Sequence, residues 1–347
     1  MIDIGRLFEL LESIGIRGYE AKAYLALVEI GEAPALVIAS KAGIPQPRVY
    51  EVLDSLLKKG LVEVKIGRPR TYRALPPNIA LSFYARKYVD NIHSRAMRLI
   101  TELSKLYSSS IREHEPLIWI NYSFDSGLER AKRLIANMKY DGFLSINSHV
   151  LDRLQATISE KLKNNTRSVL AITVIGKETK EKALERIKAL SRVELRRLPT
   201  GVVQMLETDL SDVMVFGENY TMHSRERELI LIINEVYYFG YWRLAEPVKS
   251  IQVNRGDKFI TAHHWLAMDL ALRALKEGFN IKTRVRGYQV GSRRPVVIEG
   301  YIKKVVKVPE DHVRTIIVET PSREVKVRGL GASLEDVEAR LIELQIE

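Results

Sequence analysis

The stretch APALVIASKAGIPQPRVYEVLDSLLKKG, residues 33–60, decides the fold of the N-terminal part of the chain. Its apolar residues recur at helical spacing up to Gly43 and again after Pro45, which predicts two helices joined by a tight turn. This pattern is typical of a helix-turn-helix, in which the first turn of the second helix reaches base edges in the major groove. Arg and Gln have donors that suit such edges. The side chains expected to read bases are Gln46, Arg48 and Tyr50.

Residues 61–75 predict a β-hairpin directly after these helices, with the turn GRPR at residues 67–70. In the segment 41–73, eight basic residues stand against three acidic ones, a net charge of +5 that suits contact with phosphates. The hairpin is therefore interpreted as a wing. The alternative is a small protein-interaction domain whose charges are only solvated. The residues expected on the DNA backbone or in the minor groove are Lys65, Arg68, Arg70 and Arg73.

Length and composition limit the number of domains, the partners and the kinds of site that the chain can have. A chain of 347 residues suggests two or three domains, and its net charge of +11 suits nucleic acid, an anionic ligand or a membrane surface equally well. The lack of cysteine excludes disulfides, thiolate metal sites and cysteine nucleophiles. The apolar stretches are too short to span a bilayer and the N-terminus has no secretory leader, so we expect no membrane partner and a cytoplasmic location.

Four parts follow one another along the chain, which predicts a multidomain α+β protein. Residues 1–77 form the winged helix-turn-helix domain, and residues 78–115 form a long helix. Strands and helices alternate in residues 116–246, which indicates an α/β sheet domain. Residues 247–347 are β-rich, and Pro247 marks the boundary between these last two parts.

The long helix carries an apolar stripe whose average step lies near the coiled-coil repeat. Its members are Leu81, Ala85, Tyr88, Ile92, Ala96, Leu99, Leu103 and Leu106. We expect a dimeric coiled coil, because winged-helix regulators usually bind two-fold symmetric sites. The alternative is an ordinary long helix that lies on the chain's own C-terminal domain.

Finer assignments in the second half rest on shorter patterns. We expect a strand at 228–233, a helix near 235–243 and a last helix at 334–344. The segment 282–328 holds twelve basic and five acidic residues, and many of the basic ones alternate along the expected strands. That alternation is consistent with a solvated face.

Signatures of catalysis and of metal binding are missing from the sequence. We find no G-x-S-x-G, G-x-x-x-x-G-K-[ST] or H-E-x-x-H motif. His263 and His264 are adjacent, so they point to different sides of a helix, and they lack a third ligand at suitable spacing. Glu207, Asp209 and Asp212 lie in an expected loop, where acids are more often hydrated than catalytic. We expect no metal, no cofactor and no enzyme activity.

The order of these parts resembles that of the TrmB family of archaeal sugar-responsive transcriptional regulators. The resemblance rests on IPQPRVYEVL at 44–53 followed by GRPRTYR at 67–73. Further on, RRLP at 196–199, HSREREL at 223–229 and YWR at 241–243 look like the family's effector domain. The sheet part of that domain is similar to phospholipase D, whose paired H-x-K motifs are absent here, so the resemblance implies a shared fold without its reaction.

The resemblance also implies an effector site in the β-rich part. The family's sugar contacts lie in a segment that ends in Val-Ile-Glu, and this chain has matching residues at 297–299, where a carboxylate can accept bonds from two hydroxyls. Two arginines stand near the place where maltose-binding members have a Gly-Met pair, so a sugar phosphate or a sugar acid is an alternative effector. The effector residues expected are Val297, Ile298, Glu299, Arg293 and Arg294.

Together these features predict a homodimeric regulator that binds double-stranded DNA at an operator and responds to a sugar or a sugar-derived effector. Two alternatives belong to other classes. One is a DNA-packaging protein with little sequence preference that also uses the basic C-terminal strands. The other is a phosphodiesterase built on the phospholipase D-like α/β domain, for which the sequence offers no hydrolytic centre.

Overall fold

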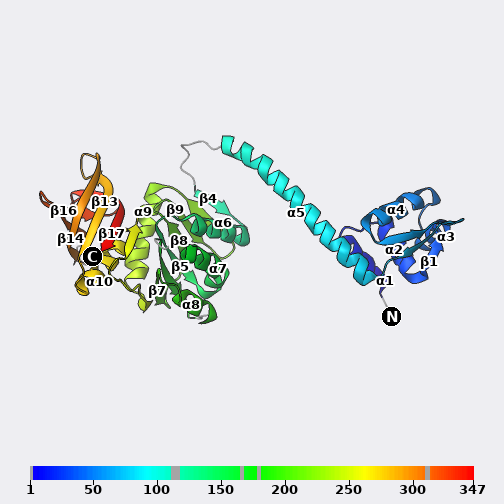
Figure 1. The fold of residues 1–347 in the computed structure, drawn as a ribbon, viewed down its shortest axis with the longest axis horizontal. Helices are drawn as coiled ribbons and strands as arrows, with labels where there is room; N and C mark the ends of the chain where they lie inside the picture. Colours follow the sequence, from blue (N-terminus) through cyan, green and yellow to red (C-terminus); the bar gives the residue numbers. More distant parts are fainter. Residues whose placement is uncertain (1–2, 111–117, 165–167, 178–180, 309–312) are drawn as a thin grey trace. The chain divides into compact units, whose positions relative to one another are not determined.

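The computed structural model describes residues 3–110, 118–164, 168–177, 181–308 and 313–347. The chain divides into two compact units, Met1–Glu113 and His114–Glu347 (Figure 1). Both units combine helices with strands, which confirms the prediction of a multidomain α+β chain. None of the described helices is long and apolar enough to cross a membrane.

The first unit is a winged helix-turn-helix followed by a long helix. A three-stranded sheet of order β1-β3-β2 stands beside the helices. Its elements are α1 (Ile4–Ser13), α2 (Tyr19–Ile30), β1 (Glu32–Pro34), α3 (Ala35–Ala42), α4 (Gln46–Lys59), β2 (Val62–Lys65), β3 (Thr71–Ala74) and α5 (Pro77–Ser110).

Backbone conformation and core packing explain why the helices of this unit end where they do. α3 ends at Gly43 and α4 at Gly60, and both glycines adopt the left-handed conformation that a helix C-terminus favours. The inner faces of α2, α3 and α4 share one core that includes Leu27, Ile38 and Leu53. The sequence therefore predicted this domain correctly, because local spacing and glycine stops determine its helices.

The second unit contains an eight-stranded mixed sheet of order β11-β7-β6-β5-β8-β9-β10-β4. Its strands are β4 (Ile118–Asn121), β5 (Asp141–Asn147), β6 (Val169–Ile175), β7 (Val193–Leu198), β8 (Gln204–Thr208), β9 (Asp212–Phe216), β10 (Thr221–Ser224) and β11 (Glu246–Lys249). The helices of this region are α6 (Phe124–Asn137), α7 (Ser148–Asn164), α8 (Glu181–Lys188), α9 (Arg227–Val236) and the π-helical turn η1 (Tyr237–Trp242). β5, β6 and β7 run parallel, and every residue of β6 is buried, as expected for a central parallel strand.

The same unit ends in a closed β-barrel. Its sheet has the order β12-β17-β13-β14-β15-β16, and a parallel pairing of β16 with β17 closes it. Its elements are β12 (Lys258–Thr261), α10 (His264–Lys276), β13 (Ile281–Gln289), β14 (Pro295–Val308), β15 (Val313–Glu319), β16 (Glu324–Arg328) and β17 (Val337–Ile346). One core unites Phe143 of the large sheet, Trp265 of α10 and Val285 of the barrel, so the sheet and the barrel pack on each other.

The last helix expected from the sequence, at 334–344, is wrong, because this segment is strand β17. A β-bulge at Arg340 shifts the alternation of buried side chains by one residue. The buried apolar residues Ala339 and Ile342 consequently stand three residues apart, a step that also occurs in a helix. The bulge thus gave a strand the apparent pattern of a helix.

Three other assignments in the second unit also need correction. The strand expected at 228–233 is part of helix α9, where Ile230 and Asn234 face inward one helical turn apart, since a short apolar run does not separate strand from helix. Strand β8 replaces part of the loop expected around Glu207. The large sheet also extends to Lys249 through β11, beyond the boundary expected at Pro247.

Candidate functional site

Helix α4 presents its first turns to solvent. Gln46, Arg48 and Tyr50 are exposed, whereas Val49 and Val52 of the opposite face are buried in the core. Arg48 makes no ion pair or side-chain hydrogen bond with the residues that the structure describes. All three side chains expected to read bases are thus accessible to solvent, with Gln46 and Tyr50 one helical turn apart and Arg48 on another side of the helix.

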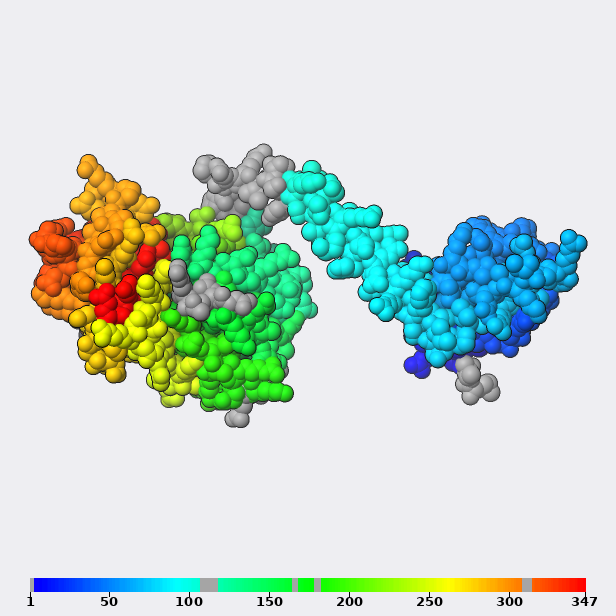
Figure 2. Space-filling model, in the orientation of Figure 1, coloured from blue at the N-terminus to red at the C-terminus, as the bar shows by residue number. Residues whose placement is uncertain are grey.

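The β2–β3 hairpin carries a basic turn. It stands out from the body of the first unit in the space-filling view (Figure 2). Arg68 and Arg70 are exposed in the turn, and within the described part of the chain neither has an ion-pair partner. Both guanidinium groups are therefore available to an external anion such as a DNA phosphate.

Lys65 and Arg73, the other two residues expected at DNA, are paired within the domain. Lys65 Nζ lies 3.5 Å from Glu32 Oε1, and Arg73 forms an ion pair with Glu63. A hydrogen bond from Thr71, together with the charge of Lys65, lowers the pKa of Glu32, so this carboxylate stays ionised. The two acids compensate part of the positive charge on the strands of the wing.

Helix α5 leaves its apolar stripe uncovered. Its first turns pack on the winged-helix core through Ala80 and Tyr84, which are buried. Beyond them, the stripe residues from Tyr88 to Leu106 are exposed. A solvent-facing row of large apolar side chains of this length is typical of a surface that binds a partner.

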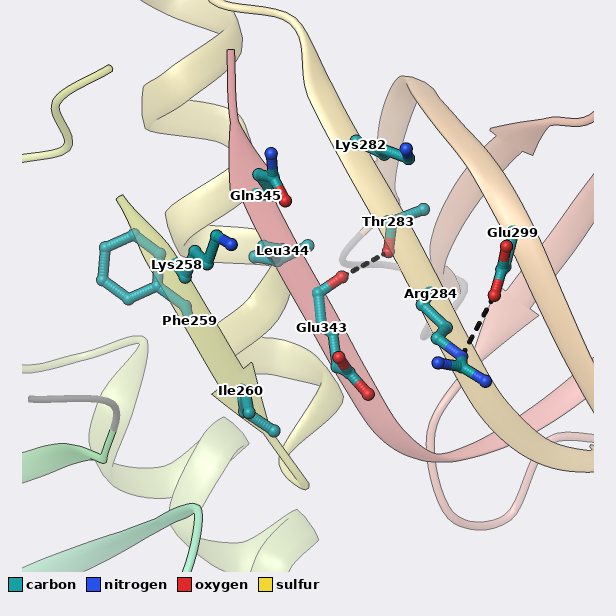
Figure 3. A pocket seen from close by; sticks show the side chains of 10 residues that line it. All are labelled: Lys258, Phe259, Ile260, Lys282, Thr283, Arg284, Glu299, Glu343, Leu344 and Gln345. Carbon is teal, nitrogen blue, oxygen red and sulfur yellow. Dashed lines mark hydrogen bonds and ion pairs between the residues drawn. The ribbon is translucent and has the colours of Figure 1, made fainter. Parts of the chain in front are cut away.

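A cavity of about 370 Å³ lies on the outer face of the barrel, over β12, β17, β13 and β14 (Figure 3). Its lining comprises Lys258, Phe259, Ile260, Lys282, Thr283, Arg284, Glu299, Glu343, Leu344 and Gln345. Lys282 and Arg284 are exposed while Thr283 between them is buried, which places the cavity outside the barrel wall. The volume suits a small ligand.

Strand pairing arranges the polar lining in two rows. Lys258 and Lys282 flank Gln345 on neighbouring strands. Two residues further along the strands, Glu343 and Glu299 flank Arg284. Cations, an amide and carboxylates thus face one cavity, which provides both donors and acceptors for a polyhydroxylated ligand.

The carboxylates of the second row already have arginine partners. Arg284 Nε lies 3.1 Å from Glu299 Oε1, an ion pair that Figure 3 shows as a dashed line. Arg286 donates to Glu343 Oε1 at 2.7 Å. Each carboxylate thus has an arginine beside it and keeps oxygen lone pairs for ligand hydroxyls.

The structure does not bring all five expected effector residues together. Glu299 lines the cavity and Val297 is exposed on the same strand, but Ile298 packs toward the barrel core. Arg294 stands five residues before Glu299, which corresponds to roughly 16 Å along an extended chain. Arg293 instead donates to Glu338 Oε1 at 3.2 Å.

Glu338 explains the fixed position of Arg293. This carboxylate is almost fully buried, and Arg340 lies 2.9 Å and Arg227 3.8 Å from it. Arg293 also has a positive φ of 56°, an uncommon conformation for a residue with a side chain. The contacts tie Arg293 to a structural ion cluster between α9 and the barrel.

Several residues of the cavity were missed in the sequence, namely Lys258, Lys282, Arg284, Glu343 and Gln345. They come from three separate strands, and Glu343 and Gln345 belong to β17, where a helix was expected. The only signal in the sequence was the alternation of charged residues after position 281, which does not show which strands are neighbours.

Ion pairs also account for most of the basic residues in the segment 282–328. Seven of the twelve form ion pairs: Arg284, Arg286, Arg293, Lys303, Lys307, Arg314 and Arg328. Their partners lie in the same unit. Most cations in the described part of this segment are therefore already compensated by an acid of the same unit.

The three acids expected as hydrated loop residues have structural roles instead. Asp209 accepts hydrogen bonds from the backbone N–H groups of Lys139 and Tyr140. Burial raises the pKa of Asp212, but hydrogen bonds from His223 and Arg225 outweigh it and lower the pKa to about 2. The expectation of hydrated surface acids was therefore wrong.

The third acid, Glu207, belongs to a fully buried cluster. His263 lies between two carboxylates, with Nε2 3.1 Å from Glu207 Oε1 and Nδ1 3.1 Å from Asp141 Oδ1. Burial disfavours the charged form of His263, yet the two acids outweigh it and raise its pKa to about 10. The cluster therefore joins β5, β8 and the start of α10 through a buried cation.

His264 has a different environment. Its Nε2 contacts the carbonyl oxygen of Val327 at 3.1 Å, and burial followed by the charge of Arg314 lowers its pKa to about 3. Among the described residues, no group of histidines and acids is arranged to hold a metal ion.

Comparison with known families gives three matches in consecutive order. Residues 11–78 match the family described as sugar-specific transcriptional regulator TrmB. Residues 117–249 match the EBD N-terminal subdomain of the transcriptional regulator TrmB, and residues 258–347 match the EBD C-terminal subdomain of TrmB and TrmBL1. The matches cover most of the chain.

Individual relatives agree with these matches. The chain is 26% identical over 341 residues to the HTH-type sugar sensing transcriptional regulator TrmBL1 of Pyrococcus furiosus, covering 96% of each chain. It is 25% identical to the DNA-binding HTH-type transcriptional repressor TrmBL2 of Thermococcus kodakarensis, covering 70% of this chain and 98% of the relative. A solved structure of TrmBL2, described as an archaeal chromatin protein, covers 71% of this chain with a TM-score of 0.48 and 22% identity.

Proposed function

Because the chain belongs to the TrmB family, we propose that it is a transcriptional regulator that binds double-stranded DNA and responds to a sugar or a sugar-derived effector. The observation that carries this proposal is the exposed first turn of α4 beside the basic turn of the wing. The relatives named above are regulators, and no step of the proposed function requires catalysis. A regulator of this kind acts in the cytoplasm, where the DNA is.

In the proposed complex, α4 lies in the major groove and the wing contacts the backbone. Arg48 and Gln46 have the donors to read base edges, and Tyr50 adds a third contact. Arg68 and Arg70 contact phosphates or the minor groove, supported by Lys65 and Arg73 on the strands of the wing. Phosphate contacts position the domain and base contacts specify the sequence.

Arg48→Ala is expected to weaken binding to the preferred DNA sequence by about 1–3 kcal/mol and to relax the base preference at one position. Its matched control is Arg68→Ala, which removes the same charge from the wing. That variant is expected to weaken binding to all sequences equally and to lower the salt slope by about one. Fluorescence anisotropy on specific and scrambled duplexes at several salt concentrations measures both effects, and an equal loss of specificity in the two variants would contradict these roles.

We propose that α5 forms a dimeric coiled coil through its exposed stripe, so that one dimer presents two reading helices to a two-fold symmetric site. An effector that binds better to one arrangement of the dimer would shift the spacing of these helices and thereby change DNA affinity. The domain division proposed with this scheme begins with 1–77 and 78–115. Because β11 belongs to the large sheet, the last two parts are divided after Lys249 rather than at Pro247, with a phospholipase D-like fold in the third part.

We propose the barrel cavity as the effector site, with Glu299 as the acceptor for sugar hydroxyls. Lys258, Lys282 and Arg284 offer donors, so the cavity suits a sugar with or without an anionic group. Val297 lies on the same strand, whereas Arg293 and Arg294 take part only if the β13–β14 loop folds toward the cavity.

Glu299→Gln is expected to weaken effector binding about 10- to 100-fold, because hydrogen bonds to a charged group contribute roughly 1.5–3 kcal/mol. The matched control is Glu324→Gln, since Glu324 forms a similar exposed ion pair with Lys303 outside the cavity. Calorimetric titration of the full chain with glucose, maltose, glucose 6-phosphate and glucuronate measures the affinity. Equal affinities in both variants would place the effector elsewhere.

A further inference from the structure

The eight-stranded sheet has two edges, and they differ in chemistry. One edge is β11, with the sequence EPVK, which contains a proline, two charges and an irregular register. Such features are the usual means of preventing a free edge from pairing with another chain. The other edge is β4, with the sequence IWIN, which contains no charge and no proline and pairs in regular register with β10.

The side chains of β4 are unusually exposed for apolar residues. Ile118, Trp119 and Ile120 are 54%, 57% and 51% exposed, and Tyr122 directly after the strand is 83% exposed. Sheets of natural proteins rarely leave such an edge open to solvent. A partner strand at β4 would satisfy its free backbone groups and cover these side chains together.

Both faces of this edge are apolar. Thr221 of β10 faces α6, because its side chain packs against Gly127 of that helix. A Cβ added to Gly127 would collide with it. Residues directly opposite each other in a sheet share a face, so Trp119 lies on the α6 side and Ile118 and Ile120 lie on the other side. A strand that pairs with β4 would therefore meet apolar side chains above and below the sheet.

We propose that β4 pairs with β4 of a second copy of this chain, antiparallel about a two-fold axis, so that the two sheets become continuous. This inference rests on the proposed α5 dimer. Ser110 at the end of α5 precedes Ile118 by eight residues, which reach at most about 27 Å. A parallel α5 coiled coil holds its helices 8–10 Å apart, so the two β4 strands share an effective concentration in the mM range.

The connection of β4 to the dimeric α5 explains why we propose a second copy of this chain as the partner of β4. A four-residue strand covers much less than the roughly 800 Å² per partner of a stable independent interface. It is therefore too small to recruit an unlinked protein, but it is sufficient once α5 has brought the two copies together. Antiparallel pairing of identical strands is also the arrangement that a two-fold axis requires.

Cross-linking of the full chain tests this inference, because the chain has no cysteine and each introduced one is unique. The variants are Ile118→Cys, Trp119→Cys and Ile120→Cys on β4, Ala96→Cys on α5 and Leu334→Cys on the exposed barrel surface. With a short bis-maleimide at micromolar protein, we expect covalent dimers from at least one β4 variant and from Ala96→Cys, and none from Leu334→Cys. Dimers from Ala96→Cys alone would overturn the β4 pairing and leave the proposed function intact, whereas no dimers from any variant would overturn both.

The effect of a charge placed on β4 on the dimer dissociation constant provides a second test. Ile120→Lys is expected to raise the dimer dissociation constant at least tenfold in sedimentation equilibrium, because a lysine on an edge strand opposes pairing. The matched control is Val248→Lys on the opposite edge strand β11, which is expected to leave the dissociation constant unchanged. Equal dissociation constants for the two variants would contradict the pairing of β4.

Discussion

Ile92→Lys in the α5 stripe is expected to lower the affinity for a two-site DNA by about 10²- to 10⁴-fold, while the winged-helix domain stays folded. Ile92 is exposed in the single chain and lies in the centre of the proposed coiled-coil seam. A lysine there would bury two unpaired charges in the dimer, so the chain would become monomeric. Two linked reading heads gain about 10²- to 10⁴-fold in avidity over one, and this gain disappears in a monomer.

The matched control for this change is Ser94→Lys. Ser94 is also exposed on α5, but it lies two residues away and thus on the other side of the helix from Ile92. Sedimentation velocity reports the oligomeric state, and anisotropy on one-site and two-site duplexes reports the affinity. If Ile92→Lys remained a dimer with unchanged affinity, α5 would not be the dimer interface.

His263→Gln is expected to reduce the unfolding free energy of the second unit by about 3–5 kcal/mol, because it removes the cation between two buried carboxylates. Asp141, Glu207 and His263 are all fully buried. Asp141 also accepts the backbone N–H groups of Ala262 and His263 at 2.9 and 3.0 Å, so the cluster fixes the start of α10 on the large sheet. Such a loss corresponds to roughly 10 °C in Tm for a unit of this size.

The neighbouring histidine is the matched control. His264→Gln removes a single neutral hydrogen bond to Val327 and is expected to cost about 0.5–1.5 kcal/mol. Urea unfolding followed by circular dichroism measures both variants. Equal losses would show that the charge of His263 does not stabilise the fold.

The same cluster predicts a dependence of stability on pH. The pKa of His263 is raised from an ordinary 6.5 to about 10 by its two acids against the effect of burial. A raised pKa stabilises the folded state fully below pH 6.5, and this stabilisation is lost as the pH rises through 10. The stability difference between the wild type and His263→Gln should therefore shrink from pH 6.5 to 10. A difference that is constant over this range would contradict the assignment.

The sequence predicted the winged domain well and the second unit less well, for physical reasons. The helices around Gly43 and Gly60 depend on local spacing and local backbone conformation, which a single chain displays directly. The assignment at β17 failed because the bulge at Arg340 imitates helical spacing, and the one at α9 failed because a short apolar run fits both structures.

The candidate effector site could be predicted from the sequence only in part. Glu299 was expected at the effector site through a resemblance, and it is one of the residues that line the barrel cavity. Lys258, Lys282 and Glu343 were not found, because they come together only when strands distant in sequence pair with each other. Arg293 was expected beside the ligand, but it donates a hydrogen bond to the buried carboxylate of Glu338 instead. No local pattern in the sequence predicts that contact.

Selection from random double-stranded DNA with the full chain tests the central claim most directly. We expect enrichment of a two-fold symmetric sequence whose half-sites lie about 10 base pairs, or a multiple of that, apart, and we expect Arg48→Ala to relax the base preference at one position of each half-site. If no sequence were enriched and the footprint extended without limit along the DNA, the chain would coat DNA as a packaging protein, and the account of a sequence-specific regulator would be wrong.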